Sequence, residues 1–363
     1  MTLTVVNVSY PLATVGSDSV GGAEQVLWML DQALTAAGHR SIVVACEGSS
    51  VAGELVTVPA MPPHAGPQAY GETHLALCAT LERIVQSTPV DLVHLHGLDF
   101  YRYLPPPGVP VLVTLHLPPS WYPAEALHPD RPDTWLQCVS QSQRRACREL
   151  AEPLYLVPNG VSLSLPAPMP RRRSFIVGLG RICPEKGFHL ALEAAARAGR
   201  PMLLGGQVYP FEAHERYFAT AIAPRLDRLR RFVGPVGRRR KVRLLSAAHC
   251  LVIPSQVPET SSLVAMEALT CGTPVVAYRQ DALADIIDQG RTGFLVESVA
   301  EMADAIEAAG ELDHQHCREV ARERFSAAAM TAGYFALYRR LCHATDYGPG
   351  AEEIDLTAAS ASC

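Results

Sequence analysis

Lysine is nearly absent from this chain of 363 residues, which contains only Lys186 and Lys241 beside its many arginines. No apolar run reaches the roughly 18 residues that a membrane-spanning helix needs, so we expect no such helix. The first residues lack the basic start of a signal peptide and are typical of a strand, which favours a cytoplasmic location. The 10 cysteines include no C-x-x-C pair, which argues against a zinc ribbon, and the length argues against a disulfide scaffold.

Negative charge is unevenly distributed in the sequence, whose net charge is -5. Residues 1–158 contain no lysine and more acidic than basic side chains, whereas the remainder is close to neutral. An acidic half is a poor match for nucleic acid or for an anionic membrane surface. We therefore expect a soluble substrate, no nucleic-acid partner and at most a peripheral membrane contact.

The order of apolar segments predicts an α/β protein with two domains. Hydrophobic residues make up 48% and charged residues 18% of the chain, enough for two sizeable cores. Residues 3–8 read as a strand, residues 23–37 as a helix and residues 40–45 as a second strand, which is the building unit of a doubly wound sheet. The same alternation starts again with a strand at 174–180 and a helix at 188–198.

Composition also places the boundaries. We predict an N-terminal Rossmann-like domain at 1–160, a proline-rich linker at 161–173 and a C-terminal Rossmann-like domain at 174–325. A last helix is expected at 326–344, and the small, polar residues 345–363 are typical of a disordered tail.

Several shorter segments carry predictions of their own. We expect a loop where Pro and Gly are frequent, at 57–72, and a helix at 217–229. We expect the arginine run at 171–173 and most of the basic run at 238–243 to face solvent. Trp121 and Tyr122 fit either stacking on an acceptor sugar or, with more weight, holding a long loop in place.

Two carboxylates with seven residues between them flank the start of a predicted helix. Glu259 lies in the turn and Glu267 about two turns inside the helix, which should begin near the N-capping residues Thr260, Ser261 and Ser262. The first turn of a helix has unpaired amides and a positive dipole end, which suit a phosphate. The arrangement fits a ligand with both hydroxyls and phosphates, such as a nucleotide-sugar. It fits equally an ordinary strand-turn-helix unit with both acids in solvent.

Two cations flank another predicted tight turn. Arg181 and Lys186 could both reach one diphosphate, the guanidinium as a fork and the ammonium as a point charge. They could also be two surface cations beside a turn.

Glycine and histidine residues mark the first domain. The Gly21-Gly22 pair precedes the first helix and either lets a ligand approach the backbone closely or forms a flexible loop. His116 ends the strand predicted at 109–115, and His94 and His96 belong to the preceding one. A histidine at the carboxyl end of a parallel strand lies where open α/β sheets bind ligands, although each of these could be a simple loop residue.

Taken together, these segments resemble the family 4 retaining glycosyltransferases. Glu259 and Glu267 match the E-x7-E motif of that family. Further matches are CGTPVVA at 271–277, GR-x-x-PEKG at 180–187, VPNGV at 157–161 and RTGFLV at 291–296. The resemblance covers nearly the whole chain. It implies the GT-B fold, in which two Rossmann-like domains face each other across a cleft.

The resemblance also implies an activity. A family member moves a sugar, typically a hexose, from a UDP-, GDP- or ADP-sugar to a hydroxyl acceptor with retention at the anomeric carbon, in glycan, glycolipid or glycoside biosynthesis. No cofactor and no metal are expected. The alternatives are a GT-B-like phosphorylase, epimerase or hydrolase, or a non-catalytic nucleotide-sugar binder. The complete set of Arg181, Lys186, Glu259 and Glu267 favours an enzyme.

The family motifs carry roles to individual residues of this chain. Arg181 and Lys186 should hold the diphosphate, Glu267 the ribose hydroxyls and Glu259 the donor sugar, with His116 preferred over its neighbours for a position facing that sugar. The other donor-binding residues that the resemblance implies are Gly21, Gly22, Ser261, Ser262, Leu263 and Val264. The catalytic set would be His116, Glu259, Arg181 and Lys186.

Two segments depart from the family pattern. Residues 260–262 replace a glycine and an aromatic residue that commonly follow the first glutamate. Residues 279–283 stand where a Gly-Gly-rich turn is usual. Both departures indicate that the contacts to the donor sugar differ from those of other members.

Overall fold

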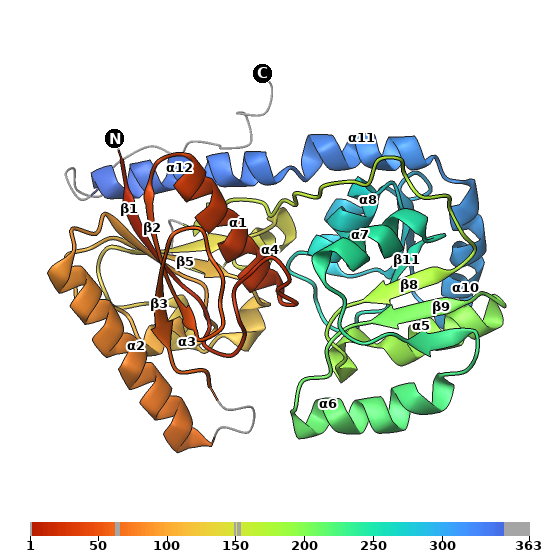
Figure 1. Cartoon of the computed structure of the whole chain (residues 1–363), viewed down its shortest axis with the longest axis horizontal. Coiled ribbons are helices and arrows are strands. Elements are labelled where there is room, and N and C mark those ends of the chain that lie inside the picture. The colour runs from red at the N-terminus through yellow and green to blue at the C-terminus, as the bar shows by residue number, and fades with distance from the viewer. Residues whose placement is uncertain (1, 62–65, 149, 151–153, 345–363) are drawn as a thin grey trace. The chain divides into compact units, whose positions relative to one another are not determined.

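The computed structural model describes residues 2–61, 66–148, 150 and 154–344, and it divides the chain into two compact units (Figure 1). Unit 1 comprises Met1–Asn159 and Ala327–Cys363, and unit 2 comprises Gly160–Ser326. Each unit is built on a sheet whose paired strands are parallel. The predicted disordered tail, 345–363, lies outside the described residues.

Unit 1 contains a seven-stranded sheet in the order β3-β2-β1-β4-β5-β6-β7. The order of strands reverses between the central pair β1 and β4, and this is the point at which doubly wound sheets bind ligands. The strands are β1 (Thr4–Val8), β2 (Arg40–Cys46), β3 (Glu54–Val58), β4 (Leu92–Leu95), β5 (Val111–Leu115), β6 (Thr134–Cys138) and β7 (Leu154–Leu156).

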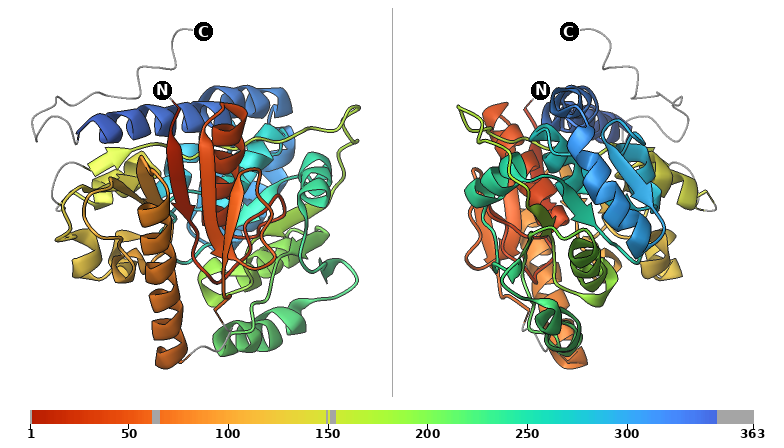
Figure 2. Two further views of the ribbon diagram at one scale, coloured as in Figure 1. Left: turned by 60° about the vertical axis from the view of Figure 1, so that its left-hand side comes forward. Right: turned by 90° about the vertical axis from the view of Figure 1, so that its right-hand side faces the viewer.

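Helices cover both faces of this sheet because successive side chains of its strands point to opposite sides. On β2, Ile42 and Val44 belong to the core that contains Leu77 and Leu81 of α2, whereas Val43 packs with α1 on the other face (Figure 2). The helices of unit 1 are α1 (Gly22–Ala36), α2 (Pro67–Ser87), α3 (Ala124–Leu127), α4 (Gln141–Ala146) and α12 (Ala327–Ala344), with 3-10 turns η1 (Phe100–Arg102) and η2 (Pro119–Trp121).

The last helix, α12, is an integral part of unit 1 although it follows unit 2 in the sequence. Its residues Tyr334 and Tyr338 are fully buried. The hydroxyl of Tyr338 lies 2.7 Å from Nδ1 of His94, and that of Tyr334 donates to Oε1 of Gln137 over 3.0 Å. These buried polar contacts fix α12 on β4 and β6.

Unit 2 contains a six-stranded sheet in the order β10-β9-β8-β11-β12-β13, with its reversal between β8 and β11. The strands are β8 (Ile176–Leu179), β9 (Met202–Gly205), β10 (Arg230–Phe232), β11 (Leu251–Ile253), β12 (Val275–Tyr278) and β13 (Gly293–Val296).

Two groups of helices cover this second sheet. α5 and α10 contribute Phe188, Leu192, Met302 and Ile306 to one core, while α8 contacts both α7 and α11 (Figure 1). The helices are α5 (Phe188–Arg197), α6 (Glu212–Tyr217), α7 (Arg238–Ala247), α8 (Leu263–Thr270), α9 (Asp281–Ile286), α10 (Val299–Ala308) and α11 (His314–Arg324). Short turns are η3 (Pro184–Lys186), the π-helical η4 (Phe218–Ile222), η5 (Ala223–Arg225) and η6 (Ala309–Glu311).

Two predicted segments are wrong. The expected loop at 57–72 contains the end of β3 and the start of α2, because Gly66 serves as N-cap and Pro67 occupies a first helical position that proline favours. The expected helix at 217–229 is instead a succession of α6, η4 and η5, which ends where Pro224 removes a backbone donor.

The arginine run at 171–173 does not lie wholly in solvent as predicted. Arg171 and Arg173 are exposed, but the guanidinium of Arg172 donates to the backbone oxygens of Ala248 and Cys271, each at 2.9 Å. Burial, with a smaller contribution from the charge of Arg318, lowers the pKa of Arg172 to about 10. This side chain therefore ties the residues that lead into β8 to the ends of α7 and α8.

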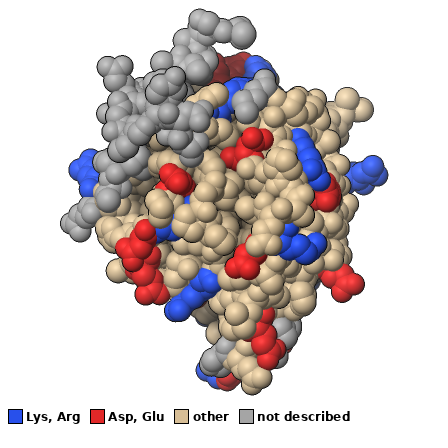
Figure 3. All heavy atoms as spheres, turned by 90° about the vertical axis from the view of Figure 1, so that its left-hand side faces the viewer, with Lys and Arg blue, Asp and Glu red and all other residues tan. Residues whose placement is uncertain are grey.

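Surface charge and hydropathy add two observations. On the face in Figure 3, acidic and basic side chains are interspersed, and neither sign gathers into one patch. Among the described helices, none combines the length and apolar character needed to cross a bilayer.

Candidate active site

The reversal point of the unit 2 sheet brings together two loops that are far apart in the sequence. β8 and β11 pair directly, and the loop after each leaves from the carboxyl end of its strand. The loop after β8 carries Arg181 and Lys186, and the loop after β11 carries Glu259. These predicted residues therefore lie at the edge where open α/β sheets bind ligands.

Glycine allows these two loops to approach each other. Gly187 ends the η3 turn with φ of 62°, a left-handed conformation that favours glycine. A Cβ atom at this position would lie 2.3 Å from the carbonyl oxygen of Pro254 in the other loop. The amide of Gln256 donates to the carbonyl oxygen of Glu185 over 2.7 Å, which links the loops directly. The Pro-Glu-Lys-Gly sequence thus positions Lys186 against the β11 loop.

Lys186 and Glu259 form an ion pair between the two loops. Nζ of Lys186 lies 2.5 Å from Oε1 of Glu259, and the side chains are 25% and 9% exposed. The carbonyl oxygen of Glu259 also accepts a hydrogen bond from the amide of Ala282 at the start of α9. The carboxylate is therefore fixed at the edge of the sheet, beside an ammonium group that a phosphate could also contact.

Glu267 forms a second ion pair, with Lys241. Nζ of Lys241, on α7, lies 2.5 Å from Oε1 of Glu267, on α8, and the side chains are 15% and 6% exposed. Because α8 begins at Leu263, Glu267 lies one turn inside the helix and not the two turns predicted. Both lysines of the chain thus pair with the two glutamates of the E-x7-E pattern.

Lys241 is a candidate site residue that the sequence did not single out, because most of the basic run at 238–243 was predicted to face solvent. Arg239, Arg240 and Arg243 are exposed, as predicted, but Lys241 points toward α8. The signal that could have identified Lys241 is the rarity of lysine, because Lys186 and Lys241 are the two lysines of the sequence.

Arg181 differs from the two lysines because it is not neutralised. In the part of the chain that the structure describes, no carboxylate lies within ion-pair distance of its guanidinium. Its positive charge nevertheless acts on its neighbours, and lowers the pKa of both Glu185 and His214. Burial is the largest single influence on each group. It lowers the pKa of His214, and it opposes the net lowering of the pKa of Glu185, to which hydrogen bonds from the backbone of Glu185 and from the Cys183 side chain contribute more than Arg181 does. Arg181 is thus a cation available to an anionic ligand.

The start of α8 supplies backbone amides. Ser262 is the N-cap of the helix and its side chain makes no capping hydrogen bond. Oγ of Ser261 is buried and has no hydrogen-bond partner among the described residues. Leu263 and Val264 form the first turn, whose amides have no acceptor within the helix. The four predicted residues 261–264 therefore present donors at the positive end of a helix dipole.

The glycine pair lies at the corresponding position in unit 1. Gly21 is the N-cap of α1 and Gly22 its first residue, on the loop that follows β1. A Cβ atom on Gly21 would lie 1.9 Å from a carboxylate oxygen of Glu24, which is buried in the first helical turn. A side chain at position 21 would therefore have to displace the Glu24 carboxylate, which is the far end of a flexible side chain.

His116 and His96 lie side by side at the carboxyl edge of the unit 1 sheet, at the ends of β5 and β4. Nε2 of His116 is 2.9 Å from Nδ1 of His96, and the rings stack with centroids 5.2 Å apart. Burial lowers the pKa of His116 to about 3, and it lowers that of His96 far below the usual value. The two imidazoles are therefore neutral at physiological pH, and each can donate one hydrogen bond and accept another.

His94 has a structural role. Its Nδ1 contacts the hydroxyl of Tyr338 and its Nε2 that of Thr114, both at 2.7 Å, so both ring nitrogens are engaged inside unit 1. Tyr122 is buried and its hydroxyl accepts a hydrogen bond from the amide of Leu117, whereas Trp121 remains exposed. Tyr122 holds its loop in place, which was the favoured reading for this aromatic pair.

Two family models match the chain, one in each half. The model described as Glycosyltransferase Family 4 matches residues 20–165, and the model described as Glycosyl transferases group 1 matches residues 173–311. Between them they include the glycine pair, the histidines, both lysines and both glutamates.

Curated relatives are aligned over parts of their length. A D-inositol 3-phosphate glycosyltransferase of Arthrobacter sp. (strain FB24) is 30% identical over 283 residues, which are 64% of this chain and 66% of the relative. A protein of the same name from Corynebacterium efficiens is 33% identical over 137 residues, which are 36% of this chain and 32% of the relative. The chain thus spans between 32% and 66% of the length of these two relatives.

Solved structures resemble the chain over nearly its full length. Sucrose-phosphate synthase from Thermosynechococcus elongatus has a TM-score of 0.78 at 21% identity, with 94% of this chain and 100% of that one covered. AviGT4, a glycosyltransferase involved in avilamycin A biosynthesis, has a TM-score of 0.68 at 23% identity, with 94% and 98% covered. Anabaena Alr3699/HepE in complex with UDP-glucose has a TM-score of 0.71 at 17% identity, with 93% and 100% covered. At these identities the likeness shows a shared fold.

Proposed function

Because this chain belongs to the family 4, group 1 glycosyltransferases and has their GT-B fold, we propose that it transfers a sugar from a nucleotide-sugar donor to a hydroxyl acceptor. The observation that carries the proposal is the set of charges at the reversal point of the unit 2 sheet. Arg181 and the Lys186–Glu259 pair lie in the loops that follow β8 and β11, and the Lys241–Glu267 pair joins α7 to α8, whose start supplies backbone amides.

The charges at this edge suit a nucleoside diphosphate that carries a sugar. Arg181 and the amides of residues 261–264 would meet the diphosphate, and Lys186 would exchange part of its contact with Glu259 for a phosphate oxygen. Glu259 would then accept hydrogen bonds from hydroxyls of the donor sugar. Glu267, held by Lys241, would accept from the ribose hydroxyls. Each carboxylate is acceptor-only when ionised, which matches a ligand rich in hydroxyl donors.

The reaction that fits these groups needs no nucleophile from the enzyme. The bond between the anomeric carbon and the diphosphate oxygen breaks, and the acceptor oxygen attacks the same face. The hydroxyl proton of the acceptor passes to the departing phosphate oxygen, and the same-face attack retains the configuration. Charge accumulates on the diphosphate as it leaves, and fixed cations and helix-end amides stabilise it without reorganisation.

For His116 we propose a role toward the transferred sugar. With Nε2 of His116 facing His96, Nδ1 of the neutral ring would exchange one hydrogen bond with a hydroxyl group without adding charge. His96 fixes the ring through the 2.9 Å contact between Nδ1 of His96 and Nε2 of His116. Gly21 and Gly22 would add backbone donors from the start of α1.

The donor is proposed to be a UDP-sugar. The Anabaena protein of the same fold has been solved in complex with UDP-glucose, and this supports a uridine nucleotide ahead of GDP- and ADP-sugars. The curated relatives are named for D-inositol 3-phosphate, so inositol 3-phosphate is an acceptor to test first among hydroxyl compounds. The cellular process would be glycan, glycolipid or glycoside biosynthesis.

Thermal unfolding of the whole chain with UDP, GDP, ADP and dTDP tests the donor site. A nucleotide present at about 100 times its dissociation constant stabilises the folded state by about 2.7 kcal/mol, so a clear upward shift of Tm is expected with UDP. The shift should disappear in the double variant Lys186→Met/Glu259→Gln, which removes both charges of the pair and so leaves no buried charge unpaired. Arg200→Ala, which breaks the more exposed Arg200–Glu307 pair in the same unit, is the matched control and should keep the full shift.

Either of two results would contradict the donor assignment. A full UDP-induced rise of Tm in the double variant would show that Lys186 does not contact the diphosphate. The absence of any rise of Tm with all four nucleotides would contradict nucleotide binding. Product analysis with and without acceptor then separates transfer from the other enzyme classes. Free sugar formed at the same rate in both cases would indicate a hydrolase, phosphate-dependent release a phosphorylase, and an isomerised donor an epimerase.

A further inference from the structure

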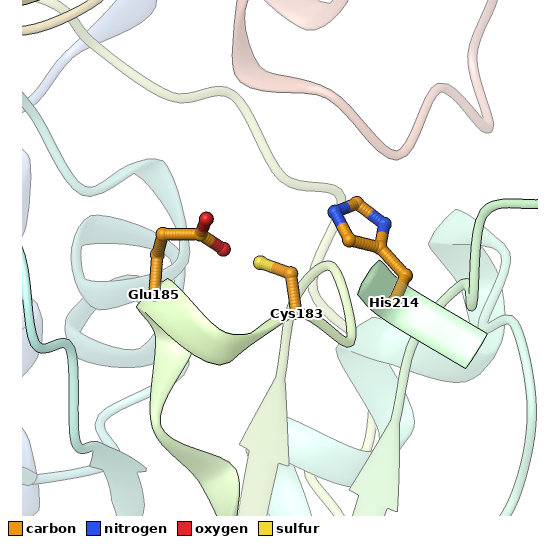
Figure 4. Close-up of side chains that lie close together, drawn as sticks. All are labelled: Cys183, Glu185 and His214. Atoms are coloured by element: carbon orange, nitrogen blue, oxygen red, sulfur yellow. The ribbon is translucent and has the colours of Figure 1, made fainter. Parts of the chain in front are cut away.

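Three side chains with metal-binding atoms lie together in unit 2. Sγ of Cys183, a carboxylate oxygen of Glu185 and a ring nitrogen of His214 all lie within 4.8 Å of one another. Figure 4 shows the sulfur and the carboxylate pointing toward each other, with one nitrogen of the imidazole ring facing them. The group combines a soft thiol, an imidazole and a carboxylate, which is a ligand set that zinc accepts.

Local structure brings these residues together. Cys183 is the N-cap of η3 and its extended conformation, with φ of -146° and ψ of 160°, lets residues 183 and 185 present their side chains to the same side of the turn. His214 comes from α6, which lies against η3. The turn itself is fixed by the hydrogen bond from the amide of Gln256 to the carbonyl oxygen of Glu185.

The imidazole of His214 is held by aromatic neighbours. Its ring packs edge-on against Phe211 at 5.2 Å and against Tyr209 at 6.4 Å between centroids. Its Nδ1 atom is buried and makes no hydrogen bond in the part of the chain that the structure describes. A buried imidazole nitrogen without a partner costs free energy, so the ring orientation is set by packing and not by a polar contact within the protein.

The spacing of the ligand atoms suits a small cation after a modest contraction. In a tetrahedral zinc site with bonds of about 2.0 to 2.3 Å, neighbouring ligand atoms are about 3.3 to 3.8 Å apart. The observed upper limit of 4.8 Å is therefore roughly 1 Å too wide, which side-chain rotation alone can close. Three protein ligands leave a fourth position for water or for an anion.

The charges around the group are compatible with a dication. Thiolate and carboxylate together would offset the two charges of zinc, and the nearby guanidinium of Arg181 favours the deprotonated state of both Cys183 and Glu185. Burial raises the pKa of the Cys183 thiol to about 11, and the thiol contacts the carbonyl oxygen of Arg181 at 3.7 Å. Metal binding must therefore release the thiol proton, as at other cysteine-containing zinc sites.

We propose that Cys183, Glu185 and His214 form a zinc-binding site with one open coordination position. The site belongs to this chain in particular, because Cys183 occupies one of the two variable positions of the GR-x-x-PEKG motif and His214 lies outside the motif. It shares its turn with Lys186, so a bound ion would hold that turn in one conformation.

Metal binding to the purified whole chain tests the proposal without reference to any enzyme activity. The chain, freed of metal with a chelator, is titrated with zinc in competition with a chromophoric chelator, and separately with cobalt(II). One equivalent of zinc should bind. The cobalt(II) protein should show the charge-transfer absorption of a cobalt–thiolate bond and the visible bands of tetrahedral coordination.

Single substitutions identify the ligands. Cys183→Ser should abolish the charge-transfer band, and Glu185→Gln and His214→Gln should each weaken zinc binding by more than the roughly 10- to 100-fold that loss of an outer-shell partner costs. The matched controls are Cys250→Ser, a buried thiol outside the group, and His189→Gln, a histidine on the neighbouring helix α5. Circular dichroism confirms folding of each variant.

Two outcomes would overturn the proposal. Wild-type chain that binds less than one equivalent of zinc at micromolar concentration has no such site. A cobalt–thiolate band that persists in Cys183→Ser but is lost in Cys250→Ser places the metal elsewhere. Neither outcome depends on the glycosyltransferase proposal, because UDP-induced stabilisation is measured separately on metal-free protein.

Discussion

The two units hold their candidate site residues at equivalent edges of similar sheets, but the edge of unit 2 carries ion pairs whereas that of unit 1 carries neutral imidazoles. In unit 2, ionised side chains are kept at the edge in pairs, Lys186 with Glu259 and Lys241 with Glu267. In unit 1, the corresponding edge presents His96 and His116, whose pKa values are lowered by burial so that both rings are neutral. One fold therefore provides an edge with paired charges in unit 2 and an edge with uncharged imidazoles in unit 1.

This difference suggests which part of the proposed donor each unit contacts. Under the proposed function, a diphosphate needs cations and helix-end amides, and the paired carboxylates hold the two lysine side chains in position. Sugar hydroxyls need donors and acceptors without net charge, and a pair of neutral imidazoles supplies both. The predictions below ask whether the pairs in unit 2 and the neutral rings in unit 1 behave in this way.

The largest effect is expected from breaking the more buried ion pair of unit 2. Lys241→Met leaves the carboxylate of Glu267, which is 6% exposed, without a partner, and removal of one member of a buried pair costs about 3 to 5 kcal/mol. Urea unfolding of the whole chain, followed by circular dichroism, measures this loss. Lys241→Met/Glu267→Gln should regain most of the stability while UDP affinity stays reduced.

The control for this prediction is an exposed pair in the same unit. Arg200→Ala breaks the pair with Glu307, which is half exposed, and should cost no more than about 1 kcal/mol. If Lys241→Met were as mild as Arg200→Ala, the Lys241–Glu267 pair would be solvated in solution, and the contrast between the two units would fail.

Much of this fold could be predicted from the sequence because buried strands and helices have strong periodicity. The strands that begin each unit are apolar runs that the sequence shows clearly. Four candidate site residues follow recognisable strand ends and turns: Arg181, Lys186, Glu259 and Glu267. The Pro- and Gly-rich composition of residues 57–72 predicts a loop and so hides the start of α2, although Gly66 and Pro67 are residue types that often begin a helix. Asp313, which caps α11 through the amide of Gln315, is a similar signal that was not used.

The remaining site residues could not be found by local pattern because their partners are distant in the sequence. Lys241 acquires its role only because α7 lies against α8, and the pairing of His96 with His116 depends on the adjacency of β4 and β5. His214 reaches Cys183 from about thirty residues away through the contact of α6 with η3. Such pairings are properties of the tertiary structure.

The next effect concerns the neutral edge of unit 1. His116→Ala should lower the turnover of sugar transfer by about 100-fold, the lower end of what a positioned proton-handling group contributes, while UDP affinity changes by less than about threefold. Steady-state kinetics and UDP titration measure the two quantities. His116→Gln, which can still hydrogen-bond to His96, should recover part of the turnover, and His128→Ala, an exposed histidine of the same unit, should change neither.

An equal loss of turnover and UDP affinity in His116→Ala would place this residue with the nucleotide-binding groups and not with the transferred sugar. Full activity in His116→Gln would show that His116 acts only by holding His96. Either result would contradict a role of the unit 1 edge toward the transferred sugar, because the neutral rings would then serve nucleotide binding or structure alone.

The last prediction is a pH dependence of stability, with the smallest change expected for any single side chain. Burial lowers the pKa values of His94, His96 and His116 in the folded chain, whereas in the unfolded chain each should titrate near 6.5. Below about pH 6.5 the unfolded state binds more protons than the folded state, so stability is complete above this pH and falls as pH decreases toward the folded values. The slope is at most about 1.4 kcal/mol per pH unit for each histidine.

Urea unfolding at about pH 7.5 and about pH 5.5 measures this effect, with a loss of about 1 kcal/mol for each buried histidine over the interval. His116→Asn should reduce the loss by the share of one histidine, and His128→Asn, at an exposed position, should leave it unchanged. A wild-type stability that is the same at both pH values would mean that these rings titrate normally in the folded chain. The neutral edge of unit 1 would then be charged at mildly acid pH, and the contrast with the paired charges of unit 2 would not hold under those conditions.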